Sequence, residues 1–135
     1  MQQTDVHAAY RAAMEAGDPE AVKATLAPDI TFHSPVTPKP FVGRDAAGHV
    51  LANILEVFED LRFTAELAGG DQVAIVFEAR IGDRDLQGID LLTFDDDGLI
   101  SEFRVLVRPL TGVVAIQNAM APRFGSQPVV LTTAG

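Results

Sequence analysis

The fold is decided by residues 61–108, which read LRFTAELAGGDQVAIVFEARIGDRDLQGIDLLTFDDDGLISEFRVLVR. Apolar and polar residues alternate along most of this stretch, as is typical of strands that bury one face. The alternation is interrupted by Gly69-Gly70-Asp71, Gly82-Asp83 and Asp95-Asp96-Asp97-Gly98, which all favour tight turns. Four strands joined by tight turns predict an antiparallel meander.

The residues around the meander predict helices. Thr4 can cap a first helix that Gly17 ends, and Asp18, followed by a proline, can cap a short second helix. Apolar residues share one side of a third segment, which opens at Gly43. A short extended run separates the second and third helices, and Thr111 can cap a final helix after the meander.

The predicted order of elements is α-α-β-α-β-β-β-β-α, which places the chain in the α+β class. We expect a single domain over residues 1–124, followed by a tail over residues 125–135. In this domain a curved, mainly antiparallel sheet wraps around the three helices of the N-terminal half, and a further helix follows at the C-terminal end. A twisted sheet that curls over helices leaves a cleft, so we expect a pocket for an apolar small molecule.

The composition excludes several classes of function. The chain has 135 residues, a formal net charge of −9 and no cysteine. An acidic surface repels phosphate backbones, which argues against nucleic-acid binding, and the absence of cysteine excludes thiol chemistry and suits a cytoplasmic protein. No apolar run reaches the ~20 residues that cross a bilayer, and no signal-peptide pattern is present. His7, His33 and His49 lack metal-site spacing, and no glycine-rich phosphate loop occurs, so we expect neither metal nor cofactor.

Two segments carry a resemblance to a known superfamily. They are VHAAYRAAMEAGDPEAVKATLAPDITFHSPV at residues 6–36, followed by GRDAA, and GIDLLTFDDDGLISEFRVLVRP at residues 88–109. This sequence resembles the nuclear-transport-factor-2-like superfamily, which includes ketosteroid isomerases, scytalone dehydratase, limonene epoxide hydrolase and SnoaL-like polyketide cyclases. The resemblance implies a cystatin-like α+β cone. It says little about activity, because this fold hosts unrelated chemistries and non-enzymes.

The first segment is most similar to a ketosteroid isomerase. Such enzymes place a tyrosine on the first helix and an aspartic acid on a central strand, and both donate hydrogen bonds to a developing enolate. A second aspartate, just before a Pro-Val step, moves the proton. The resemblance implies Tyr10 and Asp90 for the first two roles, but the third position is Ser34, before Pro35-Val36. A serine hydroxyl is not a base near pH 7, so the expected carboxylate is missing.

Three residues are candidates for catalysis: Asp90, Tyr10 and His33. Asp90 lies in a strand that is apolar on both faces, where a carboxylate must be paired, hydrogen-bonded or protonated, unless it sits at a bulge or faces solvent. Tyr10 is equally consistent with a core tyrosine bonded to a backbone carbonyl. His33 can exchange protons at neutral pH, although strand alternation puts it opposite Ser34. The candidate ligand-binding residues are Ser34, Phe58, Phe77, Phe103, Val105 and Leu92.

The charged residues of the last predicted strand bear on whether the chain could hydrolyse epoxides. Glu102, Arg104 and Arg108 alternate with apolar residues, which we expect to face the pocket. The charged residues are then expected to face solvent or a partner subunit. This argues against the Asp–Arg–Asp arrangement that limonene epoxide hydrolase has in its pocket. Arg80 and Asp90 could supply such an arrangement only if the expected inner and outer faces of the sheet were exchanged.

Three functions stay open at this point. The first is a cofactor-independent isomerase or lyase, similar to a steroid delta-isomerase, that isomerises, dehydrates or cyclises an apolar carbonyl compound. The second is a non-catalytic ligand-binding protein, which the missing base at Ser34 favours. The third, compatible with both, is an accessory homodimer in which the outer face of the sheet, with Ile100, Leu106 and Arg104, packs on a second copy.

Overall fold

One curved sheet dominates the computed structural model of the chain, which describes residues 3–125. The six strands lie in the order β2-β1-β6-β5-β4-β3. β1 pairs with β6 in parallel, and every other pair is antiparallel. The predicted α+β class with a mainly antiparallel, curved sheet is therefore confirmed. The strands are β1 (Leu26–His33), β2 (Phe41–Val42), β3 (Glu59–Gly69), β4 (Gln72–Ile81), β5 (Arg84–Phe94) and β6 (Ile100–Arg108).

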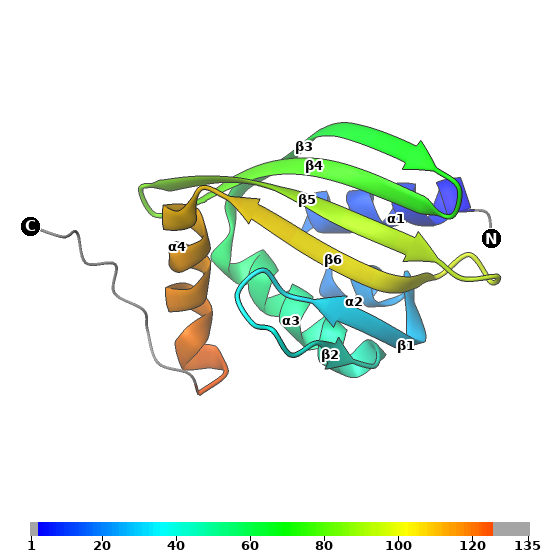
Figure 1. Cartoon of the computed structure of the whole chain (residues 1–135), viewed down its shortest axis with the longest axis horizontal. Coiled ribbons are helices and arrows are strands. Elements are labelled where there is room, and N and C mark those ends of the chain that lie inside the picture. Colours follow the sequence, from blue (N-terminus) through cyan, green and yellow to red (C-terminus); the bar gives the residue numbers. More distant parts are fainter. Residues whose placement is uncertain (1–2, 126–135) are drawn as a thin grey trace, which may run out of the picture.

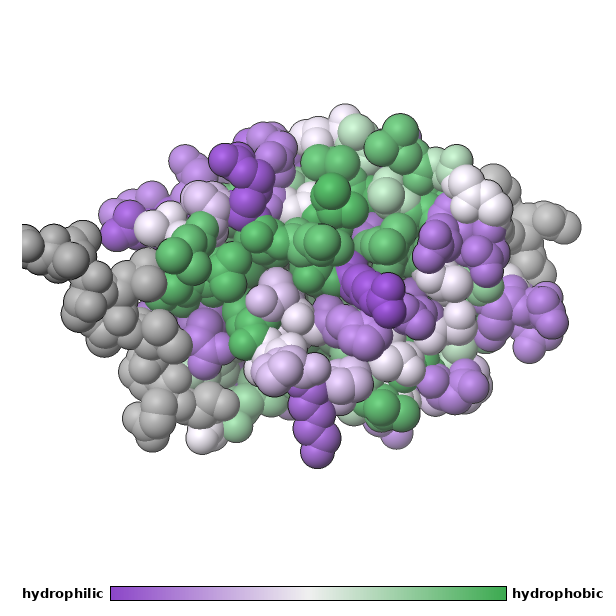
Figure 2. All heavy atoms as spheres, in the orientation of Figure 1, coloured by the Kyte–Doolittle hydropathy of each residue, from purple (hydrophilic) through white to green (hydrophobic). Residues whose placement is uncertain are grey.

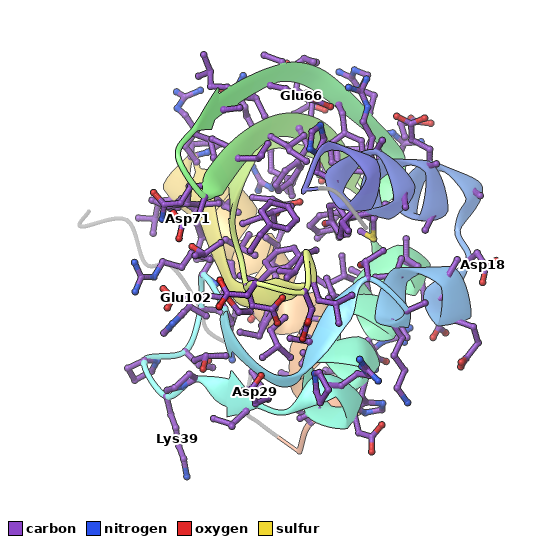
Figure 3. The ribbon with its side chains drawn as sticks, turned by 90° about the vertical axis from the view of Figure 1, so that its right-hand side faces the viewer. Asp18, Asp29, Lys39, Glu66, Asp71 and Glu102 are labelled. Atoms are coloured by element: carbon purple, nitrogen blue, oxygen red, sulfur yellow. The ribbon has the colours of Figure 1, made fainter. Side chains whose placement is uncertain are left out.

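The first three helices pack behind the sheet, and the fourth stands across its end (Figure 1). Viewed from the side, the sheet curls over α1, with β3 and its Glu66 above that helix (Figure 3). The helices are α1 (Gln3–Ala16), α2 (Pro19–Lys23), α3 (Arg44–Val57) and α4 (Leu110–Met120), and the 3-10 turn η1 (Ala121–Arg123) follows α4.

The helix boundaries follow the expected capping chemistry only in part. Gly17 takes a φ of 67°, which ends α1, and the Asp18 carboxylate accepts a hydrogen bond from the Ala21 N–H at 3.1 Å, which caps α2. Thr4 lies within α1, so the expected cap there is wrong, and its side chain is outside the described part. α4 begins at Leu110 with Pro109 as its N-cap, so the expected cap at Thr111 is wrong by two residues, because the proline ends the strand and the helix follows it at once.

The sheet presents two chemically different faces, because strand residues alternate between them. In β5 the buried residues are Leu86, Gly88, Asp90, Leu92 and Phe94, which all lie on the concave face toward the helices. This face supplies most of the core, together with the inner sides of α1 and α3. Asp90 therefore points inward.

Ile100 lies on the concave side, which contradicts its expected place on the outer face. It is fully buried, and its backbone N–H donates to the Thr25 carbonyl at 3.0 Å. The register between β5 and β6 shifts by one residue after Thr93, and this irregularity puts Ile100 and Phe103 on the same side. Sequence alternation alone does not show such a shift.

The convex face carries an apolar row that runs across three strands. Val76, Ile89 and Leu106 are register partners on β4, β5 and β6, and Ile89 and Leu106 are exposed. Hydrophobic residues gather across the middle of this face in Figure 2. Among the helices of residues 3–125, none is long and apolar enough to cross a membrane.

Candidate functional site

A cavity of about 290 Å³ lies between the concave face of the sheet and the helices. Its walls come from α1, the end of β1 and the loop after it, α3, the strands β3 to β6, and the C-terminal end of α4 with the residues after it. Apolar side chains form most of the wall, and phenylalanines are its commonest component. The phenylalanines that line it are Phe32, Phe41, Phe58, Phe63, Phe77 and Phe124.

A hydrogen-bonded pair supplies the polar part of this wall. The Tyr10 hydroxyl donates to Oδ2 of Asp90 at 2.7 Å. Tyr10 is fully buried and Asp90 is 5% exposed, yet both line the cavity. Tyr10 follows Val6 by one helical turn on the buried side of α1, and strand alternation turns Asp90 toward it from the centre of β5.

Burial controls the proton affinity of this pair. It raises the pKa of Asp90 from 3.8 to about 7, although the hydrogen bond from Tyr10 acts in the opposite direction. Burial also raises the pKa of Tyr10, and the charge of Asp90 adds to that effect. No ion pair within residues 3–125 reaches Asp90. At neutral pH the Asp90 carboxyl therefore populates both its protonated and its ionised form.

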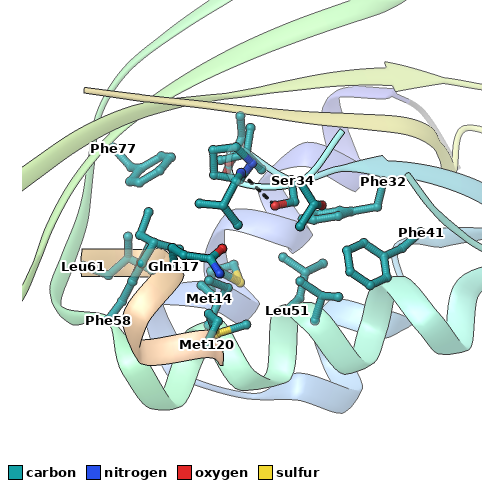
Figure 4. A pocket seen from close by; sticks show the side chains of 18 of the residues that line it. Met14, Phe32, Ser34, Phe41, Leu51, Phe58, Leu61, Phe77, Gln117 and Met120 are labelled. Carbon is teal, nitrogen blue, oxygen red and sulfur yellow. Dashed lines mark hydrogen bonds between the residues drawn. The ribbon is translucent and has the colours of Figure 1, made fainter. Parts of the chain in front are cut away.

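Ser34 lies at the end of β1, where the chain leaves the sheet. Its Oγ accepts a hydrogen bond from the Val36 N–H at 3.0 Å, which is drawn as a dashed line in Figure 4. This contact orders the proline-containing loop, of which Pro35, Val36 and Thr37 also line the cavity. The position before the Pro-Val step thus faces the cavity, but with a hydroxyl in place of a carboxylate.

The wall contributed by α4 and η1 was missed in the sequence. Gln117 and Met120 reach into the cavity from α4 (Figure 4). Phe124, which follows η1, also lines it. Arg123 fastens this segment to α3, because its Nη1 lies 2.8 Å from Oδ1 of Asn53 and 3.3 Å from Oε1 of Glu56. The apolar periodicity of the last helix was visible in the sequence, but the surface on which it packs was not.

The structure brings six of the predicted site residues together and leaves three outside. Phe103 and Leu92 are fully buried in the core and do not line the cavity. The Phe103 ring lies 5.4 Å from the Tyr10 ring and 4.9 Å from the Phe32 ring, so it supports the tyrosine from behind. The predicted residues that line the cavity are Tyr10, Asp90, Ser34, Phe58, Phe77 and Val105.

His33 is the third residue outside, because it follows the buried Phe32 and so points to the convex face. Its Nε2 lies 3.9 Å from Oε1 of Glu102, which pairs with Arg104 at 2.6 Å. This corrects the expectation that His33 joins the catalytic group.

Two further sequence hypotheses concern charged side chains and metals. Arg80 pairs with Glu59 and Asp60 at the far edge of the sheet, so the Asp–Arg arrangement with Asp90 is not assembled. No group of three or more metal-binding side chains occurs among the described residues.

Comparisons with known proteins agree with this geometry. The profile of the SnoaL-like domain matches residues 6–103. A steroid delta-isomerase from Pseudomonas aeruginosa superposes with a TM-score of 0.87 at 36% identity, covering 91% of each chain. An uncharacterised protein with a cystatin-like fold from Silicibacter pomeroyi superposes with a TM-score of 0.84 at 33% identity, covering 87% of this chain and 84% of the other.

A third solved structure has the same fold. A protein of unknown function with a cystatin-like fold from Xanthomonas campestris shares 28% identity with a TM-score of 0.73, over 86% of this chain and 98% of that one. No curated protein matches the sequence significantly. The profile match covers well over half of the chain, and the first two structures exceed 30% identity over most of it. The chain therefore belongs to the SnoaL-like domain family of the nuclear-transport-factor-2-like superfamily.

Proposed function

We propose that this protein binds an apolar carbonyl compound in its cavity and catalyses proton transfer next to the carbonyl group, as an isomerase or lyase. The Tyr10–Asp90 hydrogen bond inside an apolar cavity is the observation that carries the proposal. A buried carboxyl without a cation is costly to maintain, and such groups are common where a carboxyl must exchange protons.

The surroundings of the pair support this function. The cavity wall around it is mostly phenylalanine and aliphatic side chains, which favours a neutral, largely apolar ligand. A water-poor site strengthens the hydrogen bonds that stabilise charge developing on a substrate oxygen. The likeness to a steroid delta-isomerase at 36% identity points to the same class of carbonyl chemistry.

Turnover of a small set of ketones tests the proposal. The set contains a β,γ-unsaturated ketosteroid and a smaller bicyclic β,γ-unsaturated ketone, and formation of the conjugated product is followed by ultraviolet absorbance. We expect conversion by the wild type and about tenfold or greater loss of kcat/KM in Tyr10→Phe, because the hydroxyl orders the reacting carboxyl.

A non-catalytic binding protein is the second candidate, and the hydroxyl at Ser34 favours it, because that position lacks a carboxylate. It predicts that the same ketones raise the Tm without being converted. Binding without turnover across the whole set would contradict the enzymatic proposal and support this one.

We also propose that two copies pack through the convex face. The row of half-buried Val76 and exposed Ile89 and Leu106 supports this arrangement, since exposed apolar patches mark interaction surfaces. The mass in solution tests it: we expect a dimer at micromolar concentration and a monomer for Leu106→Glu. A wild-type monomer at that concentration would contradict the proposal.

A further inference from the structure

A second hollow adjoins the cavity near the ends of α1 and α3. It has a volume of about 220 Å³ and is open to solvent along the exposed residues 15–17. This hollow, the outer groove, is lined by residues 14–17, Leu55, Phe58 and Leu61. Three of these residues, Met14, Phe58 and Leu61, also line the main cavity, so their side chains form a wall that the two spaces share (Figure 4).

The shared wall contains a side chain that can move aside. Met14 is unbranched and has three rotatable bonds, and methionine adapts readily to a changed neighbourhood. Phe58 and Leu61 are only half-buried, and the Phe58 ring lies 6.0 Å from the ring of Phe77, which lines the main cavity. Displacement of Met14 therefore joins the main cavity to the outer groove without unfolding either helix.

Helix α1 sets the length of the route between the two spaces. Tyr10 and Met14 are buried and lie four residues apart, so they share one side of this helix, which Gly17 ends with a φ of 67°. At about 1.5 Å per residue, the distance along the helix from Tyr10 to Gly17 is about 10 Å. A biphenyl ketone spans this distance from its carbonyl carbon to a substituent at the far end of the second ring.

The polar end of the outer groove favours a hydrogen-bond donor. The Glu15 carboxylate is about half exposed, and its Oε1 accepts a hydrogen bond from Nε of Arg11 at 3.1 Å. The C-terminal end of α1, which carries a partial negative charge, lies at the same place. A carboxylate is repelled there. A neutral hydroxyl fits better than an ammonium group, because Arg11 already balances the charge of Glu15.

We propose that the protein takes an elongated apolar ketone whose far end passes Met14 and donates a hydroxyl hydrogen bond to Glu15 in the outer groove. The inference rests on the proposed function, which places the carbonyl group in the main cavity. It adds a second subsite, which selects the opposite end of the ligand. The apolar wall of the main cavity and the carboxylate of the outer groove together select a ligand that is apolar along its length and polar at its tip.

Three rigid ketones of equal length test the preference for a hydroxyl: 4-acetylbiphenyl and its 4′-hydroxymethyl and 4′-carboxylate derivatives. Dissociation constants are measured by isothermal titration calorimetry at low salt. We expect the hydroxymethyl compound to bind about fivefold more tightly than 4-acetylbiphenyl, and the carboxylate about fivefold more weakly. In Glu15→Ala both differences are expected to shrink to within about twofold. Glu20→Ala removes an exposed carboxylate outside the groove and is expected to keep the wild-type order.

A second variant tests the path of the ligand independently of its polar tip. Ala16 is exposed and lines the outer groove, so Ala16→Phe fills this space from outside. We expect the ratio of the affinities for 4-acetylbiphenyl and acetophenone to fall about tenfold in this variant, because only the longer ketone reaches the groove. Ala12→Phe places the same ring on an exposed position of α1 outside both spaces, and the ratio is expected to stay as in the wild type.

The outcomes separate this inference from the proposed function. Equal affinities for the three biphenyl ketones, or an affinity ratio that Ala16→Phe leaves unchanged, would overturn the second subsite. If the β,γ-unsaturated ketones are still converted in that case, the proposed function stands. If the protein neither converts those ketones nor binds acetophenone or the biphenyl ketones, both are overturned.

Discussion

Two carboxyl groups on neighbouring strands of one sheet experience opposite environments. Asp90 faces the concave side, where it is buried against the Tyr10 hydroxyl and no ion pair within residues 3–125 reaches it. Glu102 faces the convex side, where it is partly exposed and pairs with Arg104 at 2.6 Å. A carboxyl buried beside a hydroxyl can gain or lose a proton near neutrality, because burial disfavours its charged form. The comparison shows that the face of the strand, and not the residue type, decides which carboxyl is suited to chemistry.

The largest expected difference between the two faces is in activity. Asp90→Asn is expected to reduce the conversion of β,γ-unsaturated ketones by about 10²–10⁴-fold, because an amide cannot take up or release the proton. The matched change on the other face, Glu102→Gln, is expected to leave the rate within about twofold. Steady-state kinetics of the two variants side by side measure this. Equal losses would show that the faces do not differ as described.

The second difference is in the pH dependence of stability. The pKa of Asp90 is raised from 3.8 to about 7 in the folded state, so the folded protein binds the proton more tightly than the unfolded chain does. The stability contributed by this group is therefore present below about pH 4 and is lost as the pH increases toward and beyond 7. At pH 8 the buried charge is expected to cost about 4 kcal/mol.

Asp90→Asn removes this cost, so the variant is expected to gain stability relative to the wild type between pH 5 and pH 8. The free energy of unfolding, measured by denaturant titration at both pH values, checks the difference between the two proteins. Glu102→Gln serves as the control and is expected to show no such gain. If the free energies of unfolding of wild type and Asp90→Asn differed by the same amount at pH 5 and at pH 8, this would contradict the placement of a carboxyl without an ion pair inside the cavity.

A third prediction concerns how tightly the concave face is packed. A methyl group at Gly88 would meet the Phe77 ring and would lie 2.7 Å from the Leu106 carbonyl oxygen. Gly88→Ala is therefore expected to destabilise the fold by about 1–3 kcal/mol and to disturb the Phe77 ring that lines the cavity. Gly69→Ala, where a methyl group meets nothing within 4 Å, is the matched control. Thermal unfolding of both variants makes the comparison, and equal Tm values would argue against this packing.

The smallest expected effect belongs to His33. Its imidazole is about one-third exposed and lies 3.9 Å from Glu102, so His33→Ala is expected to change the free energy of unfolding by no more than about 0.5 kcal/mol. Its kcat/KM is expected to equal that of the wild type. A loss of activity comparable to that of Asp90→Asn would show that His33 reaches the cavity in solution.

Much of this architecture was predictable because the meander carries a clear period of two. The alternation through β3 and β4 and the turn signals that follow them were sufficient for the α+β class and the curved sheet. The inward direction of Asp90 was not decided by the pattern, because Ile89 and Leu91 make the opposite face apolar as well. Three-dimensional pairing with Tyr10 was needed to resolve it.

The predictions from the sequence that were wrong or incomplete have identifiable physical causes. Ile100 was misplaced because the register shift after Thr93 leaves no mark in the residue pattern. Phe103 was expected in the cavity, and it does lie on the concave face of the sheet. However, the parallel pairing of β1 with β6 brings Phe32 against the Phe103 ring and fills that space. Gln117 was missed because its role depends on where α4 packs, and this is a property of long-range contacts.

The central claim is that a single buried carboxyl, hydrogen-bonded to Tyr10, is the proton-exchanging group of the cavity. Carbon-13 NMR titration of aspartate-labelled protein tests it directly, with Asp90→Asn assigning the resonance. We predict a pKa of about 7 for Asp90 in the wild type and a higher pKa in Tyr10→Phe, because the hydrogen bond from Tyr10 favours the ionised form. Titration of Asp90 near its ordinary value of 3.8, unchanged by Tyr10→Phe, would contradict the account.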